Sequence, residues 1–364
     1  MRKNYKIVFV ALIFILLLFP IVKFNFSGTV SSLEKRNLAT FPEFSLKYFK
    51  NLDSYIQDRF GGRDKLIQLA NFIDYNVFHK SKHNAKVVEG KKGWLYYTNA
   101  ADGNNLSDFM KTNLMSEEKS QALANKIRDI AAWCDENGIK YLFVINPNKH
   151  SVYPEYYPIE RPEGLSRSDQ NVAVFSQAGV NFIFTKDLLL ERKKNENLPL
   201  YYETDSHWNR LGAYYAYLGI KTEIEKLFPD LTFPSFDCDV NVSYRYDYND
   251  SPNDHYGDLL PFLGISSMKC TYPVVTPKTG AFEDCFDYIK NEDTAGVITK
   301  GKNPSLPKAV IYRDSFCRNL MPYLSTMFSD TEYIWKKIDD FDKDYILKSK
   351  PDIIIFEALE RMLI

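Results

Sequence analysis

SEEKSQALANKIRDIAAWCDENGIKYLFVINP, residues 116–147, pairs a helical pattern with a short, continuous apolar run. Ser116 is a typical helix N-cap with Glu118 close behind it, and Gly138 is a typical stop signal. The run that follows, residues 139–147, is apolar in the manner of a strand buried on both faces of a parallel sheet. This stretch therefore predicts a helix that leads into a central strand.

The same order of helix and apolar strand recurs along the chain. NVAVFSQAGVNFIFT (171–185) repeats it, and residues 209–228 form a long helical pattern that ends at Pro229. KAVIYRDSF (308–316) and PDIIIFEALE (351–360) are two more strand patterns. Such alternation predicts an α/β fold with an open, mostly parallel sheet and helices on both faces. Residues of about 230–300 break the pattern, and we expect an irregular β-rich insertion there.

The N-terminal residues have the pattern of a membrane segment. Arg2, Lys3 and Lys6 precede an uncharged apolar run from Ile7 to Val22. At about 1.5 Å per residue the run is roughly 24 Å long, slightly short of the ~30 Å hydrocarbon layer. We expect a single-pass anchor over residues 1–24, with its N-terminus in the cytoplasm and the rest of the chain outside the cell membrane, periplasmic or extracellular. A cleaved signal peptide is the alternative interpretation.

Three further segments are expected after this anchor. Residues 25–43 are polar and indicate a juxtamembrane linker, and residues 44–80 contain two helical patterns separated by Gly61 and Gly62. The main domain is expected over residues 81–364. It opens with KVVEGKKGWLYYTN (86–99), which predicts a β-hairpin.

The composition of the chain excludes several classes of function. Its 364 residues are 45% apolar, enough for a large core, and the net charge of −1 provides no basic face for nucleic acid. The five cysteines form no C-x-x-C pair, so neither a redox motif nor a zinc site is indicated. The alternatives for them are one disulfide among Cys238, Cys270 and Cys285, or isolated core thiols. No metal and no cofactor is expected.

Ligands bind at the carboxyl ends of the strands in such sheets, so the residues just after each apolar run are the candidates for chemistry. RDSFCRNL (313–320) follows one strand and turns towards a helical pattern. Ser315 is therefore expected near backbone N–H groups that can stabilise an oxyanion. Serine needs an oriented base, and TDSHW (204–208) supplies His207 with Asp205 as its partner. Helix capping is the alternative role for Asp205 and Ser315.

Two stretches together, TDSHWNRLGAYYAY (204–217) and YRDSFCRNLMPYLSTMF (312–328), resemble the SGNH-hydrolase-like exopolysaccharide O-acetyltransferases. That family includes the alginate O-acetylation proteins and related membrane-anchored D-H-H-W proteins. Weaker marks cover nearly all of the rest of the chain: EKRNLATFPEF, YIQDRFGGRDKLI, GKKGWLYY, INPNKHSVYPEYYP, GDLLPFLG and KPDIIIFEALERML. The D-x-H element precedes the serine, which is the permuted motif order of this family.

The sequence departs from the family pattern at two points. Arg313 stands where the family often has glycine, and Ser206 makes the motif D-S-H-W rather than D-H-H-W. There is also no G-x-N-D stretch to supply the asparagine oxyanion donor of the wider superfamily. The oxyanion hole is therefore undefined beyond the backbone N–H of Ser315.

The resemblance implies a membrane-anchored O-acetyltransferase. Ser315 matches the acyl-carrying serine, His207 the general base and Asp205 its partner. The acetyl group would come from a multi-spanning membrane acyltransferase and pass to hydroxyls of a cell-surface or secreted polysaccharide. Two competing functions are an acetyl esterase with the same triad and a non-catalytic scaffold of a polysaccharide or teichoic-acid assembly complex.

Further side chains are expected near the same edge of the sheet. NPNKH (146–150) follows the strand that ends near Ile145, so Asn146, Lys149 and Tyr153 are candidate substrate contacts, with ordinary loop residues as the alternative. Trp208 and Arg313, beside the triad motifs, are weaker candidates. For Trp208, packing beneath the site is the preferred interpretation.

Overall fold

The computed structural model of the chain describes residues 2–31, 36–77, 86–99, 103–247, 249–251, 254–263, 265, 267–292 and 296–363. The chain divides into two compact units. The first consists of Met1–Asn84 with Leu260–Ser266, and the second of Ala85–Leu259 with Ser267–Ile364. The boundary expected between residues 80 and 81 lies outside the described residues.

The second unit is built on a mixed sheet with strand order β11-β12-β14-β13-β15-β5-β6. Strands β14, β13, β15, β5 and β6 run parallel, whereas β12 pairs antiparallel with both β14 and β11. The predicted α/β class is thus confirmed, with an antiparallel hairpin added at one edge. The strands are β5 (Lys140–Asn146), β6 (Phe182–Phe184), β11 (Phe286–Glu292), β12 (Gly296–Gly301), β13 (Lys308–Tyr312), β14 (Asp330–Ile334) and β15 (Ile353–Leu359).

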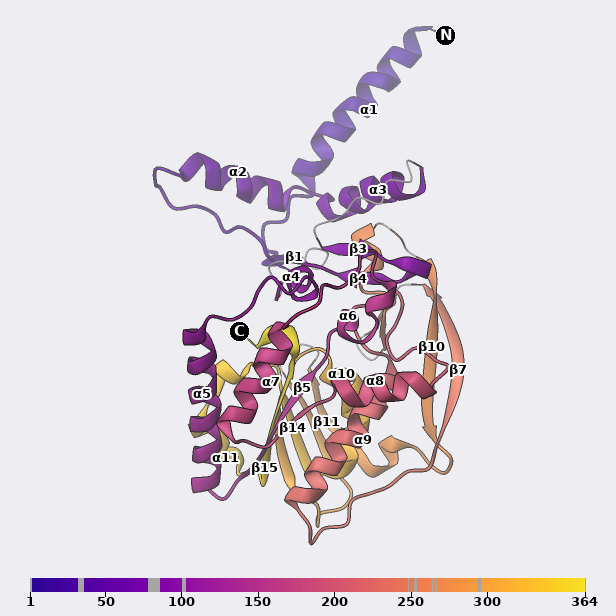
Figure 1. Ribbon diagram of the computed structural model, residues 1–364. Helices are drawn as coiled ribbons and strands as arrows, with labels where there is room; N and C mark the ends of the chain where they lie inside the picture. The colour runs from indigo at the N-terminus through magenta and orange to yellow at the C-terminus, as the bar shows by residue number, and fades with distance from the viewer. Residues whose placement is uncertain are drawn as a thin grey trace. The chain divides into compact units, whose positions relative to one another are not determined.

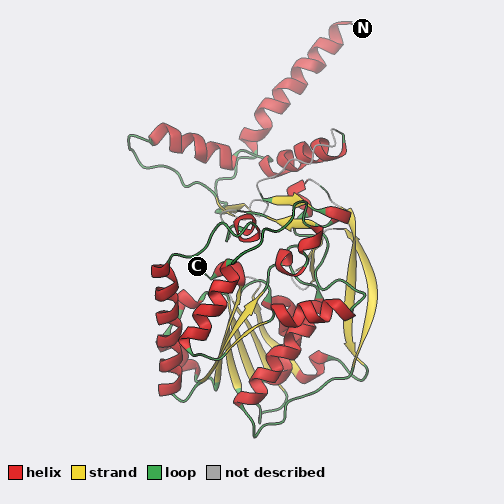
Figure 2. Cartoon of the chain, viewed as in Figure 1, coloured by secondary structure: helices red, strands yellow, loops and turns green. Residues whose placement is uncertain are grey.

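Helices cover both faces of this sheet (Figures 1 and 2). On β15, Ile353 and Ile355 face one core cluster, and Ile354 and Phe356 face the other, as the two-residue period of a strand requires. One face carries α5 (Glu117–Glu136), α7 (Arg167–Ala178) and α11 (Lys343–Ser349). The opposite face carries α8 (Lys186–Asn195), α9 (Arg210–Leu227) and α10 (Cys317–Leu324).

The expected insertion over residues 230–300 is only partly separate from the sheet. Strands β7 (Cys238–Asp247) and β10 (Ser267–Pro277) form their own antiparallel pair, and β8 (Asn249–Ser251) pairs with β9 (Asp254–Tyr256). By contrast, β11 and β12 extend the central sheet. The β-rich character that was predicted for this region is observed, and backbone pairing of β12 with β14 attaches its last hairpin to the parallel strands.

The predicted hairpin near residue 90 is confirmed as β3 (Val87–Glu89) and β4 (Leu95–Tyr97). Two short helices of the same unit, α4 (Asn105–Phe109) and α6 (Lys149–Val152), come after β4 and β5 respectively. All five cysteines are described and have free thiols, so the isolated-thiol alternative describes them.

The first unit contains α1 (Arg2–Val22), the short pair β1 (Val30–Ser31) and β2 (Arg36–Asn37), α2 (Tyr48–Arg59) and α3 (Arg63–Asn76). Gly62, with φ of 75°, separates α2 from α3 as predicted. The buried Arg59 donates to the carbonyl oxygens of Ala39 (3.1 Å) and Asn25 (3.0 Å), which ties the linker to the end of α2.

The predicted transmembrane anchor is not shown by the structure. Its residues form the helix α1, but none of the described helices has both the length and the apolarity needed to cross a membrane.

Candidate active site

Ser315 lies in the turn between β13 and α10, and the side chain of Asp314 shapes that turn. One Asp314 carboxylate oxygen accepts from the N–H of Phe316 (2.8 Å), and the other accepts from the N–H of Leu359 at the end of β15 (2.8 Å). The N–H of Asp314 in turn donates to Glu357 (2.9 Å). The turn that presents the serine is therefore held from the neighbouring strand.

Glu357 is a buried carboxyl group beneath this turn. Burial, and then the negative charge of Asp314, raise the pKa of Glu357 well above its ordinary value. Its other oxygen accepts from the Asn146 side-chain amide at 2.7 Å, and Asn146 accepts from the Thr185 hydroxyl at 3.0 Å. Asn146 is fully buried, so its amide links strand ends rather than facing the site.

Asp205 and His207 lie in a tight loop just before α9. The loop is closed by the bridge between Tyr201 and Trp208 and by the bond from the Tyr202 N–H to the His207 carbonyl (3.3 Å). Asn209 caps the helix by accepting from the N–H groups of residues 211 and 212. The expected irregular turn before a helix is thus the observed arrangement.

The structure brings Ser315, His207 and Asp205 together, although the serine and the histidine are 108 residues apart. His207 Nε2 is 2.8 Å from Ser315 Oγ, and His207 Nδ1 is 2.7 Å from Asp205 Oδ1. A carboxylate can only accept, so Nδ1 carries the proton and Nε2 is left to accept from the serine hydroxyl. The Asp205 side chain is fully buried, and that of His207 is 15% exposed.

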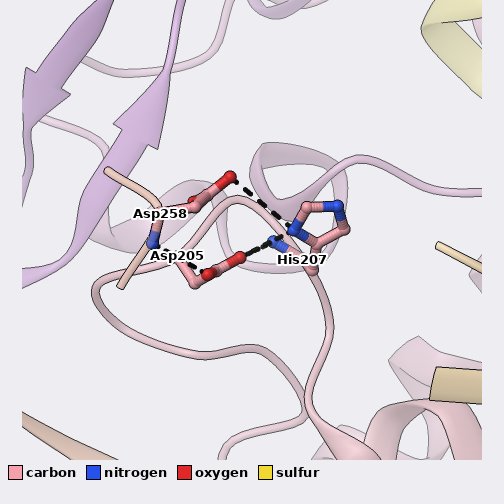
Figure 3. A group of neighbouring side chains, drawn as sticks. All are labelled: Asp205, His207 and Asp258. Atoms are coloured by element: carbon pink, nitrogen blue, oxygen red, sulfur yellow. Dashed lines mark hydrogen bonds and ion pairs between the residues drawn. The ribbon is translucent and has the colours of Figure 1, made fainter. Parts of the chain in front are cut away.

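The site also contains a residue that the sequence analysis did not single out. Asp258, which follows β9, accepts from the Ser206 N–H (2.7 Å) and the Ser206 hydroxyl (2.8 Å). The N–H of Asp258 donates to Asp205 Oδ2 at 2.9 Å, and its carboxylate lies 3.8 Å from His207 Nδ1 (Figure 3). In the sequence Asp258 lies in GDLLPFLG (257–264), which is a weak mark of the family resemblance.

Asp205, His207 and Asp258 each offer one metal-ligand atom, and these atoms lie within 4.8 Å of one another. All three groups nevertheless have hydrogen-bond partners within the protein, and Nδ1 faces Asp205 at bonding distance. The arrangement is that of an oriented imidazole, and we assign no metal to it.

Trp208 connects the two segments of the site from below. Its indole N–H donates to the Phe316 carbonyl (3.0 Å), and its own carbonyl accepts from the Asn319 amide (2.9 Å). It is fully buried, in line with packing rather than sugar binding. Arg313 is also buried, and its guanidinium lies 4.3 Å from the centroid of the Trp335 ring.

The two candidates on and after α6 also face protein groups. Tyr153 is buried, and its hydroxyl accepts from the Leu200 N–H (2.9 Å). Lys149 is buried and donates to the carbonyl oxygens of Leu95, Glu203 and Asp205 at 2.7, 2.8 and 3.0 Å. Both side chains therefore support the loop before α9 from beneath.

One relative and two solved structures resemble this chain. A probable alginate O-acetylase, AlgJ of Pseudomonas aeruginosa, is 28% identical to this chain over 203 residues. The match covers 54% of this chain and 45% of AlgJ, so it spans less than half of that protein. The structure of Bacillus cereus PatB1 gives a TM-score of 0.55 at 17% identity and covers 76% of this chain and 96% of that one. PatB1 with a sulfonyl adduct gives 0.53 at 15% identity, with 76% and 95% covered. At these identities the two structures show the fold alone.

The family model described as the SGNH hydrolase-like domain of the acetyltransferase AlgX matches residues 87–277, more than half of the chain. The matched residues include the Asp205–His207 loop and Asp258, whereas Ser315 lies after them. From this match, and with a sheet of the same fold class beneath the site, the chain belongs to the SGNH hydrolase-like acetyltransferase family of AlgX.

Proposed function

We propose that this protein is an O-acetyltransferase that carries the acetyl group on Ser315. The observation that supports it best is the hydrogen-bonded series from Ser315 Oγ to His207 Nε2 and from Nδ1 to Asp205, at 2.8 and 2.7 Å. Membership of an acetyltransferase family favours acetyl as the group that is carried.

In the first half of the proposed reaction, Ser315 Oγ attacks the carbonyl carbon of an acetyl donor while its proton passes to His207 Nε2. The negative oxygen of the tetrahedral intermediate is stabilised by the backbone N–H of Ser315, in the turn before α10. When the intermediate collapses, the proton on Nε2 goes to the leaving group. Asp205 stabilises the imidazolium between these two steps.

In the second half, an acceptor hydroxyl attacks the acetyl-serine and loses its proton to His207. Collapse returns this proton to Ser315 Oγ and releases the acetylated product. The relative AlgJ is a probable alginate O-acetylase, which supports a polysaccharide hydroxyl as the acceptor. If water took its place, the same residues would act as an acetyl esterase.

We further propose that the site works outside the cytoplasm and receives acetyl groups from a multi-spanning membrane acyltransferase. The support is the cationic residues Arg2, Lys3 and Lys6 ahead of the apolar run up to Val22, a pattern of export or anchoring. Fractionation of cells that express the full chain, with N-terminal sequencing of the product, tests this location. A product found only in the cytoplasm would refute it.

The nucleophile is tested by exposing the protein to p-nitrophenyl acetate and mapping the product by mass spectrometry. We expect one acetyl group on Ser315, and a loss of labelling rate of about 10³-fold or more in both Ser315→Ala and His207→Ala. Ser305→Ala, which changes an exposed serine in a loop of the same unit, is the matched control and should label normally. Labelling that persists in Ser315→Ala would refute the assignment.

The acceptor is tested by supplying the acetylated protein with polysaccharide in water. Net transfer to glycan hydroxyls supports the acetyltransferase, and release of acetate with no acetylated glycan supports the esterase. A folded protein that does neither, and whose Ser315→Ala variant leaves cell-surface acetylation unchanged, would be the non-catalytic scaffold.

A further inference from the structure

Asp258 is joined to the Asp205–His207 loop at three points. Its carboxylate accepts from the Ser206 N–H at 2.7 Å and from the Ser206 hydroxyl at 2.8 Å. Its backbone N–H donates to Asp205 Oδ2, the carboxylate oxygen that does not bond to the His207 ring, at 2.9 Å. Asp258 therefore fixes the position of Ser206, which lies between Asp205 and His207 in the sequence, and also that of Asp205.

Asp258 also places a second negative charge beside the imidazole. Its carboxylate is 3.8 Å from His207 Nδ1, on the same side as Asp205 at 2.7 Å (Figure 3). The Ser206 hydroxyl is 3.2 Å from His207 Nδ1 and donates to the Asp258 carboxylate at 2.8 Å. The Asp258 side chain is only 11% exposed, so water weakens this interaction less than at the surface.

The other groups around His207 define what Asp258 adds. Ser315 contacts Nε2, and the uncharged ring of Phe316 packs at 4.9 Å between ring centroids. The Lys149 ammonium approaches from beneath but bonds to the Asp205 carbonyl oxygen, not to the imidazole. Among the described contacts of the ring, the charged partners are thus Asp205 and Asp258.

We propose that Asp258 is a positioning residue of this site, which fixes the Asp205–His207 loop through Ser206 and stabilises the protonated imidazole by its charge. The proposal rests on the acetyl-serine function above. In that reaction His207 goes from neutral to cationic and back during each half. A second carboxylate lowers the free energy of the cationic imidazole, and it therefore lowers the barrier to the step that forms this cation.

Asp258→Asn separates the charge from the geometry. The amide has the shape of the carboxylate and can still accept from the Ser206 N–H, but it carries no charge. Ser206→Ala is the matched variant, since it removes the hydroxyl contact and leaves the Asp258 charge and its bond to the backbone N–H. The readout is the rate of Ser315 acetylation by p-nitrophenyl acetate as a function of pH.

We expect Asp258→Asn to slow acetylation by about tenfold and to move the acid limb of the profile to lower pH. The direction follows because the carboxylate 3.8 Å from the ring favours the positively charged state of the site, and the asparagine variant lacks that charge. Ser206→Ala should leave the acid limb in place and slow the reaction less. A merely structural role would change the amount of active protein without moving the limb.

The outcomes are distinguishable from failure of the proposed function. If the unmodified protein is not acetylated on Ser315, the proposed function fails. If it is acetylated and folded Asp258→Asn shows the same rate and the same acid limb, the role of Asp258 is refuted. Circular dichroism establishes folding, and Asp258→Ser, which also lacks the charge but keeps an oxygen acceptor, gives the same comparison if the asparagine variant does not fold.

Discussion

Lys149 shows how a single buried residue supports the loop that carries His207. Its ammonium donates to backbone carbonyl oxygens of Leu95, Glu203 and Asp205, which belong to β4 and to the loop before α9. The rings of Trp94 and Tyr96 lie 4.9 and 5.2 Å from it. A cation in such a place is retained only because its three protons are all used.

The Lys149 ammonium predicts a specific dependence of stability on pH. Burial lowers the pKa of Lys149 from 10.5 to about 8. The unfolded chain therefore holds this proton more tightly than the folded protein, and the free energy of unfolding should rise between pH 8 and 10.5. The full gain in the free energy of unfolding is about 3 kcal/mol. It is complete above pH 10.5 and is lost as the pH falls through 8.

Chemical denaturation of the unmodified protein and of Lys149→Met across this range isolates the effect. Methionine keeps most of the volume but does not titrate, so the difference in unfolding free energy between the two proteins should grow in favour of the lysine as the pH rises. A difference that stays constant from pH 7 to 10.5 would contradict the prediction.

At the scale of elements, the start of α9 sets the position of His207. Helix α9 begins against the strand-like segment at Tyr201, and the Asn209 N–H bonds to the Leu200 carbonyl at 3.0 Å. This close approach leaves room for only a hydrogen at Gly212. A Cβ there would lie 2.2 Å from the Leu200 carbonyl oxygen, which is backbone and cannot swing away.

Gly212→Ala should therefore destabilise the protein although alanine is the better helix former. We expect a loss of about 1–3 kcal/mol, because the clash outweighs the roughly 1 kcal/mol gained in helix propensity. Gly219→Ala on the same helix is the control: its Cβ would meet only the side-chain ends of Leu188 and Ile183, at 2.7 and 3.1 Å. Thermal unfolding of both variants measures this. Equal stability of the two would contradict the argument.

At the scale of the whole molecule, the groups that form the site belong to one compact unit. Ser315, His207, Asp205 and Asp258 all lie in the unit of Ala85–Leu259 and Ser267–Ile364, together with the complete central sheet. The first unit has its own elements and its own internal contacts. The chemistry of the site should therefore need only the second unit.

A chain of residues 85–364 should fold and acetylate Ser315 with p-nitrophenyl acetate at a rate within about threefold of the full chain, because all the described hydrogen bonds of the triad remain. The same chain with Ser315→Ala is the control for labelling elsewhere. A folded fragment that is not labelled, beside a full chain that is, would show that the N-terminal residues complete the site.

Local patterns along the chain determined the elements of the parallel core. The Ser116 cap, the Gly138 stop and the apolar run behind them predicted α5 and β5 closely, because capping and burial on both faces are properties of short stretches. The residue types of the hydrogen-bonded series that we propose to be catalytic, Ser315 with His207 and Asp205, were also recognisable, since each stands just after or before a predicted element.

Only the tertiary structure decided which distant groups meet. The attachment of the β11–β12 hairpin to β14 depends on backbone pairing between two segments, and neither sequence pattern indicates the other as its partner. Asp258 lies 53 residues beyond Asp205, and Lys149 lies 56 residues before it, yet both hold the same loop. Such contacts follow from the way the chain returns to one edge of the sheet. Single-residue patterns report burial and local shape, and they contain no information about which buried polar groups will satisfy each other.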